Sequence, residues 1–352
     1  MNRLQELFTY RQAKLSDQSE IMKFINNFWK PNHILSKDPD FFKYEHVDGS
    51  NINFFLAINK KTKSISGILG FIPYGRDLKS HICGVIMQVS PHANVPFLGV
   101  EIMRQMLKKT NPQTYCGIGT DPKTMIPLVK TFFKREVGIM DHYFYLNPAL
   151  NEFQIIKISK IDKNHLEKTG FNNVISLNNI QLADEKLIVE HYEQLFIEAN
   201  LPRKSLEYVL KRYLNHPIYS YKSYLICDSE SGNQSLLFAR EVEYSGSTVL
   251  RIIDFLGDVN VLGKLNVWLD SIISDNCYEY IDILCSGIDQ KLFEGSGFKL
   301  VKDVDIIVPT YFEPFICENI DIYFEKSHQD LILFKGDADG DRPNKVHSIK
   351  KN

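Results

Sequence analysis

The chain has 352 residues, 44% of them hydrophobic, and a formal net charge of −2 at pH 7. This length predicts two domains with sizeable cores, and the near-zero charge without a long basic run argues against nonspecific binding to nucleic acid or anionic membrane. No apolar run reaches the roughly 18 residues of a membrane span, and the N-terminus lacks a signal-peptide core. The six cysteines form no CxxC pair, which favours free thiols over a zinc site. We therefore expect a cytoplasmic protein that binds no metal.

The first half of the chain alternates strands with amphipathic helices. An aromatic and aliphatic face at helical spacing predicts a helix over residues 16–29, which the polar loop 32–38 separates from a short aromatic helix near Phe41. The other elements expected here are strand 9–14, hairpin 52–75, strand 81–91, helix 97–109, strand 114–121, helix 122–135 and strand 137–148.

A short loop joins the strand at 81–91 to the next helix, with Gly99 in the first turn of that helix. The first N–H groups of a helix have no partner within it and carry a partial positive charge. This strand–loop–helix corner is therefore predicted to bind a phosphate group. An ordinary strand–helix turn is the alternative.

The second half repeats this order of elements with a period near half the chain. The elements expected are strand 153–159, helices 179–200 and 204–217, three strands within 220–258, helix 262–274, strand 278–287, short helix 290–297 and strand 298–309. We therefore place one domain at 1–150 and a second at 151–352.

The sequence resembles the GNAT superfamily of acyl-CoA-dependent N-acyltransferases. The resemblance lies in the order of elements and in RQAKLSDQSEIMKFI (11–25), VSPHANVPFLGVEIMRQML (89–107) and GIGTDPKTMIPLVKTFFKREVGIM (117–140). It implies an α/β fold of the mixed-sheet, α+β type, with two tandem domains that each have a mostly antiparallel central sheet flanked by helices.

The same resemblance implies acetyl-CoA or another acyl-CoA as co-substrate, with its pyrophosphate at the corner around Gly99. That glycine matches one of the family's Q/RxxGxG/A loop, whereas Asn94 and Phe97 stand where the Gln or Arg and the first glycine would be. Backbone N–H groups make most of the expected contacts, and those of Val89 and Ser90 would polarise the thioester carbonyl. The cofactor-binding residues expected are Val89, Ser90, His92, Asn94, Phe97, Leu98, Gly99, Val100 and Asp121.

The second half differs at the equivalent corner. Asp254 and Asp258 close its strand, and two carboxylates would repel a pyrophosphate. The first half is therefore the expected cofactor half, and the second a degenerate copy.

Catalysis of acyl transfer to an amine calls for a base and for an acid that protonates the leaving thiolate. Family members often carry a tyrosine acid where this chain has Phe132 and Phe133, so Tyr143 or a water would have to replace it. His33, His92 and His142 compete as the base. Because His142 and Tyr143 are neighbours on one strand, only one of the two side chains should face inward.

Three segments, NHILSKD, DHYFYLNP and KGDADGDRPN, resemble tandem GNAT-type proteins of bacterial surface-polysaccharide synthesis. They imply an amine acceptor that is an amino sugar, in some cases nucleotide-linked. Two other classes stay open: a tandem binding protein that has lost catalysis, and a FemABX-type ligase that uses aminoacyl-tRNA.

Overall fold

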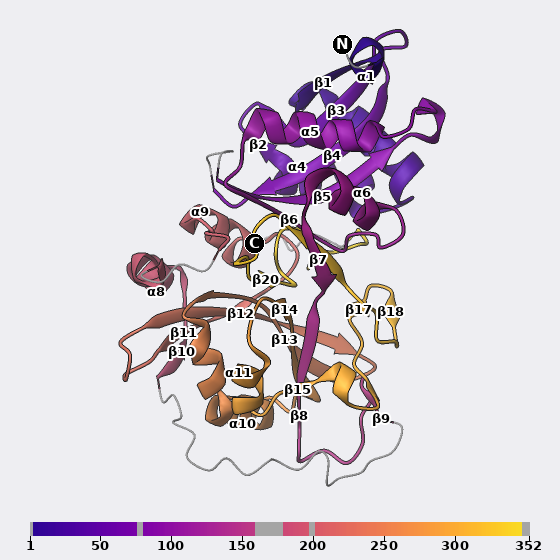
Figure 1. Cartoon of the computed structure of the whole chain (residues 1–352). Coiled ribbons are helices and arrows are strands. Elements are labelled where there is room, and N and C mark those ends of the chain that lie inside the picture. Colours follow the sequence, from indigo (N-terminus) through magenta and orange to yellow (C-terminus); the bar gives the residue numbers. More distant parts are fainter. Residues whose placement is uncertain (1–2, 76–79, 159–178, 197–200, 347–352) are drawn as a thin grey trace. The chain divides into compact units, whose positions relative to one another are not determined.

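The computed structural model describes residues 3–75, 80–158, 179–196 and 201–346, which divide into two compact units. The first unit comprises residues up to Gly138, the segment Tyr323–His328 and the chain from Ala338 onward; the second comprises Ile139–Ile322 and Gln329–Asp337. Each unit has its own sheet and core and is described separately (Figure 1).

The first unit contains a mixed sheet of eight strands in the order β1-β3-β4-β5-β6-β19-β7, with β2 beside β3. Strands β1, β3, β4 and β5 are antiparallel neighbours, and β5 and β6 are parallel. The elements are α1 (Arg3–Leu7), β1 (Phe8–Lys14), η1 (Leu15–Asp17), α2 (Gln18–Phe24), η2 (Ile25–Trp29), α3 (Ile34–Lys37), α4 (Pro39–His46), β2 (Val47–Asp48), β3 (Asn51–Asn59), β4 (Ile65–Pro73), β5 (His81–Val89), η3 (Pro91–Ala93), α5 (Leu98–Thr110), β6 (Thr114–Ile118), α6 (Met125–Phe133), β7 (Glu136–Ile139) and β19 (Tyr323–Lys326).

Helix α5 crosses one face of this sheet (Figure 1) because its apolar side chains repeat at helical spacing. Leu98, Ile102 and Met106 are buried against Phe55 and Phe71 of the sheet. Gly67 of β4 permits the close approach, since a Cβ there would lie 2.6 Å from Ile102 Cδ1.

The second unit contains a mixed sheet in the order β10-β11-β12-β13-β14-β8-β15, with β20 beside β14. It repeats the first pattern: four antiparallel neighbours, β10 to β13, precede the parallel pair β13 and β14. The elements are β8 (Asp141–Leu146), β9 (Lys157–Ile158), β10 (Ile180–Leu182), α8 (Glu185–His191), η4 (Tyr192–Phe196), α9 (Leu206–Val209), η5 (Leu210–Leu214), β11 (Lys222–Cys227), β12 (Gln234–Tyr244), β13 (Ser247–Gly257), η6 (Val259–Lys264), α10 (Asn266–Asp275), β14 (Tyr280–Ser286), α11 (Gln290–Gly295), β15 (Lys299–Leu300), η7 (Val301–Asp303), β16 (Ile306–Ile307), β17 (Tyr311–Phe312), β18 (Phe315–Ile316) and β20 (Leu333–Phe334).

These two sheets confirm the predicted fold class. The division of the chain differs from the predicted boundary at residue 150, because β8 pairs with β14 and β15 in the second sheet while β19 pairs with β6 in the first. Alternating hydrophobicity identifies a strand but does not select the sheet it joins. The sequence therefore does not show that β8 joins the second sheet and β19 the first. The end of the predicted helix 179–200 lies outside the described residues.

Candidate functional site

In the first unit, β5 and β6 pair only from His81 and Thr114 to Gly84 and Gly117. Beyond that point β5 continues to Val89, and no described strand pairs with it on the β6 side. A β-bulge lies where the two strands part, because two residues of β5, Val85 and Ile86, oppose the single residue Gly70 of β4. Bulges redirect backbone groups and are common beside active sites. The result is an open strand edge.

The β4–β5 pairing fixes which backbone groups face this open edge. The N–H of Ser90 donates to Ser66 O at 2.9 Å, so Ser66 and Ser90 form a hydrogen-bonded pair. Because such pairs alternate with non-bonded ones along an antiparallel ladder, the N–H groups of Met87 and Val89 point to the other edge. The N–H of Val89 thus faces the open edge, whereas the N–H of Ser90 is already bonded within the sheet.

Helix α5 begins next to this edge with an uncapped N-terminus. Its N-cap residue is Phe97, which contributes no side-chain hydrogen bond and has left-handed backbone angles (φ 61°). No acceptor in the described residues takes the N–H groups of Leu98, Gly99 or Val100. The first turn of this 13-residue helix therefore presents three free donors and the positive end of the helix dipole, which suit an anion.

Gly99 lets the first turn of α5 lie close to β5. A Cβ at this position would be 3.1 Å from Met87 Sδ and 3.6 Å from Val89 Cγ2. Because the side chains of Leu98 and Val100 are buried in the core, these two residues have only backbone groups to offer a ligand. The open edge and the helix N-terminus meet at this glycine.

Other residues predicted at this corner are exposed. Asn94 has left-handed angles, and the ring of His92 lies 5.8 Å from that of Phe28. Phe97 is 56% exposed, which is unusual for a large aromatic side chain, and its ring lies 5.4 Å from that of Phe132. These side chains border the corner without filling it.

Asp121 serves a different purpose. Its Oδ1 accepts hydrogen bonds from the N–H groups of Lys123 and Thr124 at 2.9 and 2.7 Å and from Thr124 Oγ1 at 2.8 Å. These bonds lower the pKa of the Asp121 carboxyl, the Thr124 N–H being the largest cause. The side chain therefore orders the turn before α6. As a carboxylate it would repel a phosphate group, so it does not help to bind one.

His33 is a structural residue in the first unit. It is 1% exposed, its Nδ1 accepts the N–H of Leu35 at 3.2 Å as the N-cap of α3, and its Nε2 lies 3.1 Å from Asn344 Oδ1. Burial, followed by the positive charges of Arg342 and Lys30, lowers the pKa of His33 to about 3. With both ring nitrogens engaged, His33 has no free lone pair for an amine proton, and it does not fit the role of base that its loop position predicts.

We expect His33→Ala to reduce stability by about 0.5–2 kcal/mol through loss of the helix cap, and to leave the pH dependence of any turnover unchanged. His33→Asn is the matched control, since asparagine also caps helices. Urea unfolding of both variants measures the first effect. A fall of kcat by orders of magnitude, with an altered pH profile, would instead restore His33 as the base.

His142 and Tyr143 of β8 belong to the second unit, and both side chains are packed. Tyr143 is 2% exposed and stacks on Phe293 with ring centroids 4.0 Å apart, which makes it a core residue. The His142 Nε2 lies 2.9 Å from the fully buried Asp282 Oδ2, and the His142 side chain is 10% exposed. The expectation that only one of them faces inward is wrong, because this part of the sheet is covered on both faces.

Arg251 of β13 holds the Asp282 carboxylate next to His142. Its Nε and Nη2 donate to Asp282 at 3.0 and 2.7 Å, and its Nη1 and Nη2 donate to the carbonyls of Thr310 and Pro309 at 2.8 Å each. Burial lowers the pKa of His142, and the hydrogen bond with Asp282 opposes this shift. His142 is therefore a neutral imidazole oriented by a carboxylate, and among the predicted histidines it has the arrangement of a base.

This cluster should make stability fall in acid. Burial alone would raise the pKa of Asp282, but the charge of Arg251 and the hydrogen bonds from His142 and Arg251 lower it to about 2. A carboxyl whose pKa is depressed in the folded state adds stability above its unfolded pKa of about 4, and this is lost as the pH falls through 2. We expect about 2 kcal/mol of the free energy of unfolding to disappear between pH 4 and pH 2. Asp282→Asn should flatten this slope in urea unfolding, and an unchanged slope would contradict the assignment.

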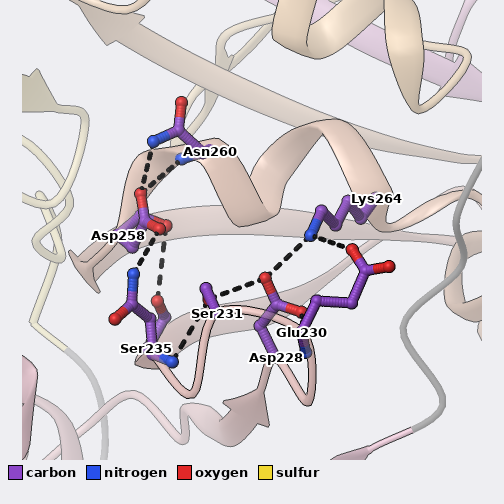
Figure 2. Close-up of polar contacts among 8 residues, drawn as sticks. Asp228, Glu230, Ser231, Ser235, Asp258, Asn260 and Lys264 are labelled. Atoms are coloured by element: carbon purple, nitrogen blue, oxygen red, sulfur yellow. Dashed lines mark hydrogen bonds and ion pairs between the residues drawn. The ribbon is translucent and has the colours of Figure 1, made fainter.

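The equivalent corner of the second unit is closed by its own side chains (Figure 2). Asp258, the N-cap of η6, accepts from the N–H of Asn260 at 3.0 Å and from the Asn233 side chain at 2.9 Å. Lys264 Nζ is bonded to Asp228 at 2.8 Å and to Glu230 at 3.1 Å. The helix N-terminus and the nearby lysine thus already have anionic partners, which supports the contrast between the two halves.

Asp254 does not face the corner as the sequence indicates, but forms a buried ion pair with Lys204. It is buried, and both of its oxygens lie 2.6 Å from Lys204 Nζ. Its charge is therefore balanced inside the second unit and does not reach a ligand at the corner. No spacing in the sequence connects Lys204 with Asp254 or Arg251 with Asp282, so these ion pairs appear only in the folded chain.

The described parts of the chain contain no membrane-spanning helix and no cluster of metal ligands. None of the helices there combines the length and apolar composition of a membrane-spanning helix. In the same residues, no three His, Cys, Asp or Glu side chains are grouped so that they could hold a metal ion.

Neither a protein-family model nor a characterised protein matches the sequence significantly. Among solved structures, the chain is similar to a GCN5-related N-acetyltransferase from Anabaena variabilis, with a TM-score of 0.53 and 13% identity over 90% of this chain and 72% of that one. For a Saccharomyces cerevisiae N-myristoyltransferase with bound myristoyl-CoA, the TM-score is 0.46 and the identity 9%, over 91% of this chain and 78% of that one. For a GCN5-related N-acetyltransferase from Sphaerobacter thermophilus, the TM-score is 0.43 and the identity 10%, over 96% of this chain and 98% of that one. The first likeness shows that the chain has the GCN5-related N-acetyltransferase fold.

Proposed function

We propose that the chain is an N-acyltransferase with two tandem GNAT-like domains, which moves an acetyl or other small acyl group from acyl-CoA to an amine. The observation that carries this proposal is the junction of an open strand edge with an uncapped helix N-terminus at Gly99. The N–H groups of Leu98, Gly99 and Val100 would hold the pyrophosphate of the cofactor, and the N–H of Met87 would bond an amide group of its extended arm.

In the proposed reaction a neutral amine attacks the thioester carbonyl carbon. The carbonyl oxygen becomes an oxyanion, which the N–H of Val89 would stabilise. The C–S bond then breaks, the thiolate of CoA leaves and takes up a proton, and the amine loses one. Phe132 and Phe133 cannot donate a proton, so the thiolate would take its proton from water.

The acceptor of the proposal is an amino sugar, in particular a nucleotide-linked one used for a surface glycan. A groove of about 620 Å³ in the first unit supports this choice. It lies between α2 with η2 and the segment of α3 and α4, and Lys23, Lys37 and Lys43 line it together with Asn26 and Asn27. Lys23 and Lys43 pair with Glu20 and Asp40 at 2.9 and 3.5 Å, so Lys37 together with the two asparagines is the part of the groove that suits a phosphorylated, hydroxyl-rich ligand.

The test is an assay of CoA thiol release and of product mass, with acetyl-CoA and a panel of amino sugars, free and nucleotide-linked. We expect acetylated product only when acetyl-CoA and a nucleotide-linked amino sugar are both present. Lys37→Glu should raise KM for that acceptor and leave the Kd of acetyl-CoA unchanged. Cofactor binding without turnover on any amine would favour the alternative of a tandem binding protein.

A further inference from the structure

In each unit two parallel strands part beyond their paired residues, β5 from β6 in the first and β13 from β14 in the second, and we call the space between them a slot. In the second unit the chain itself fills this slot. We infer that residues 331–337 are an internal ligand of this slot, which leaves one acyl-CoA site per chain. The slot and its occupant are read from the structure alone, and only the identity of the excluded ligand rests on the proposed function.

The strand pairing places this segment between β13 and β14. These strands pair only from Leu250 and Ile281 to Ile252 and Ile283. Further along β14, Cys285 and Ser286 pair with Phe334 and Leu333 of β20. Cys285 also pairs with Asp141 of β8. Because β8 takes one edge of β14, β20 must lie on the other edge, where β13 has departed.

Backbone hydrogen bonds tie the segment to both strands. The N–H of Lys335 donates to Leu284 O of β14 at 3.0 Å, and the N–H of Gly336 donates to Ile253 O of β13 at 2.7 Å. A Cβ at Gly336 would lie only 2.7 Å from Ile253 O, so a side chain does not fit there. The segment therefore makes the backbone bonds that an extended ligand would make with an open strand edge.

Side chains complete the closure. Phe334 is 2% exposed, and the space left beside it, bordered by Phe255 and Gly257, is a cavity of about 20 Å³. Such a cavity has room for about one water molecule. Lys204 Nζ lies 2.7 Å from Asp337 Oδ1 and 2.6 Å from both oxygens of Asp254, and all three side chains are buried. The ion pairs fix the end of the segment.

The first unit shows the opposite arrangement. Its strand from the C-terminal part of the chain, β19, pairs with β6 through Glu325 and Gly117. Gly117 also pairs with Gly84 of β5. By the same argument, β19 lies on the edge of β6 that faces away from β5. The open edge of β5 therefore stays clear of this strand.

Hydrogen exchange on the full chain tests the inference, with and without saturating acetyl-CoA. We expect peptides over 331–337 to exchange more than about a hundredfold slower than an unstructured peptide, and to do so equally in both conditions. Fast exchange in the free protein, or loss of protection on adding acetyl-CoA, would overturn the inference. Peptides over 85–89 report separately on the proposed function, which predicts new protection there with the cofactor.

A variant adds a second measurement. Gly336→Ala should abolish the protection of 331–337 and lower the unfolding midpoint, because its methyl group meets Ile253 O. The control is Gly263→Ala, where a Cβ would make an ordinary contact of 3.4 Å with Leu292. Full protection in Gly336→Ala would contradict the placement. If this variant does not fold, the exchange of the native chain still decides the question.

Discussion

Gly99→Glu is expected to weaken acyl-CoA binding by at least about tenfold, which corresponds to about 1.4 kcal/mol. The added carboxylate would stand in the first turn of α5, where three N–H groups have no acceptor in the described residues. It would compete for these donors and repel a pyrophosphate. Calorimetric titration with acetyl-CoA measures the change in Kd.

The matched control is Gly99→Gln, which has nearly the same size without the charge. Both side chains must displace the flexible Met87, whose Sδ lies 3.1 Å from the position of the new Cβ. We expect the neutral variant to bind more tightly than the charged one, and the difference to shrink at high salt. Equal, native affinity in both variants would remove the corner as the pyrophosphate site.

Lys204→Met is expected to destabilise the protein by about 3–5 kcal/mol, the usual effect of removing one member of a buried ionic cluster. Methionine keeps the length of the side chain but leaves the carboxylates of Asp254 and Asp337 buried without their cation. Urea unfolding measures the loss. A loss below about 1 kcal/mol would show that the cluster does not hold the second unit together.

Two further variants separate this effect from the loss of any lysine. Lys264→Met removes a partly exposed lysine that also bonds two carboxylates, Asp228 and Glu230, and should cost at most about 1 kcal/mol. Adding Asp337→Asn to Lys204→Met removes one of the two buried carboxylates that pair with Lys204. The double variant should therefore recover part of the stability, which measures the coupling between the two residues.

The sequence predicts the helices and strands of the site better than it predicts which strands pair and which side chains meet. The strand, loop and helix around Gly99 follow from local periodicity and turn residues, and the structure places them as expected. The bulge at Val85 and Ile86 left no local signal, because it depends on how β4 and β5 pair. Burial also depends on the whole fold, so the sequence does not show that His33 is buried and caps α3.

Long-range partners account for the other differences. Position on an alternating strand suggests a site for His142 and Tyr143, but the sheet they join is set by the free edge of β14. The sequence shows two acidic residues at the second corner but not their roles: Asp258 caps η6, whereas Asp254 pairs with Lys204. Both roles support the asymmetry between the halves. Only the folded chain shows that the second slot is also filled from within.

We propose that one half of the chain offers an open cofactor slot and that the other half fills its own. Calorimetric titration of the full chain with acetyl-CoA tests this most directly. We predict one equivalent bound per chain, and an affinity for acetyl-CoA at least about tenfold lower in Gly99→Glu. Two equivalents, or one equivalent with undiminished affinity in the variant, would contradict it.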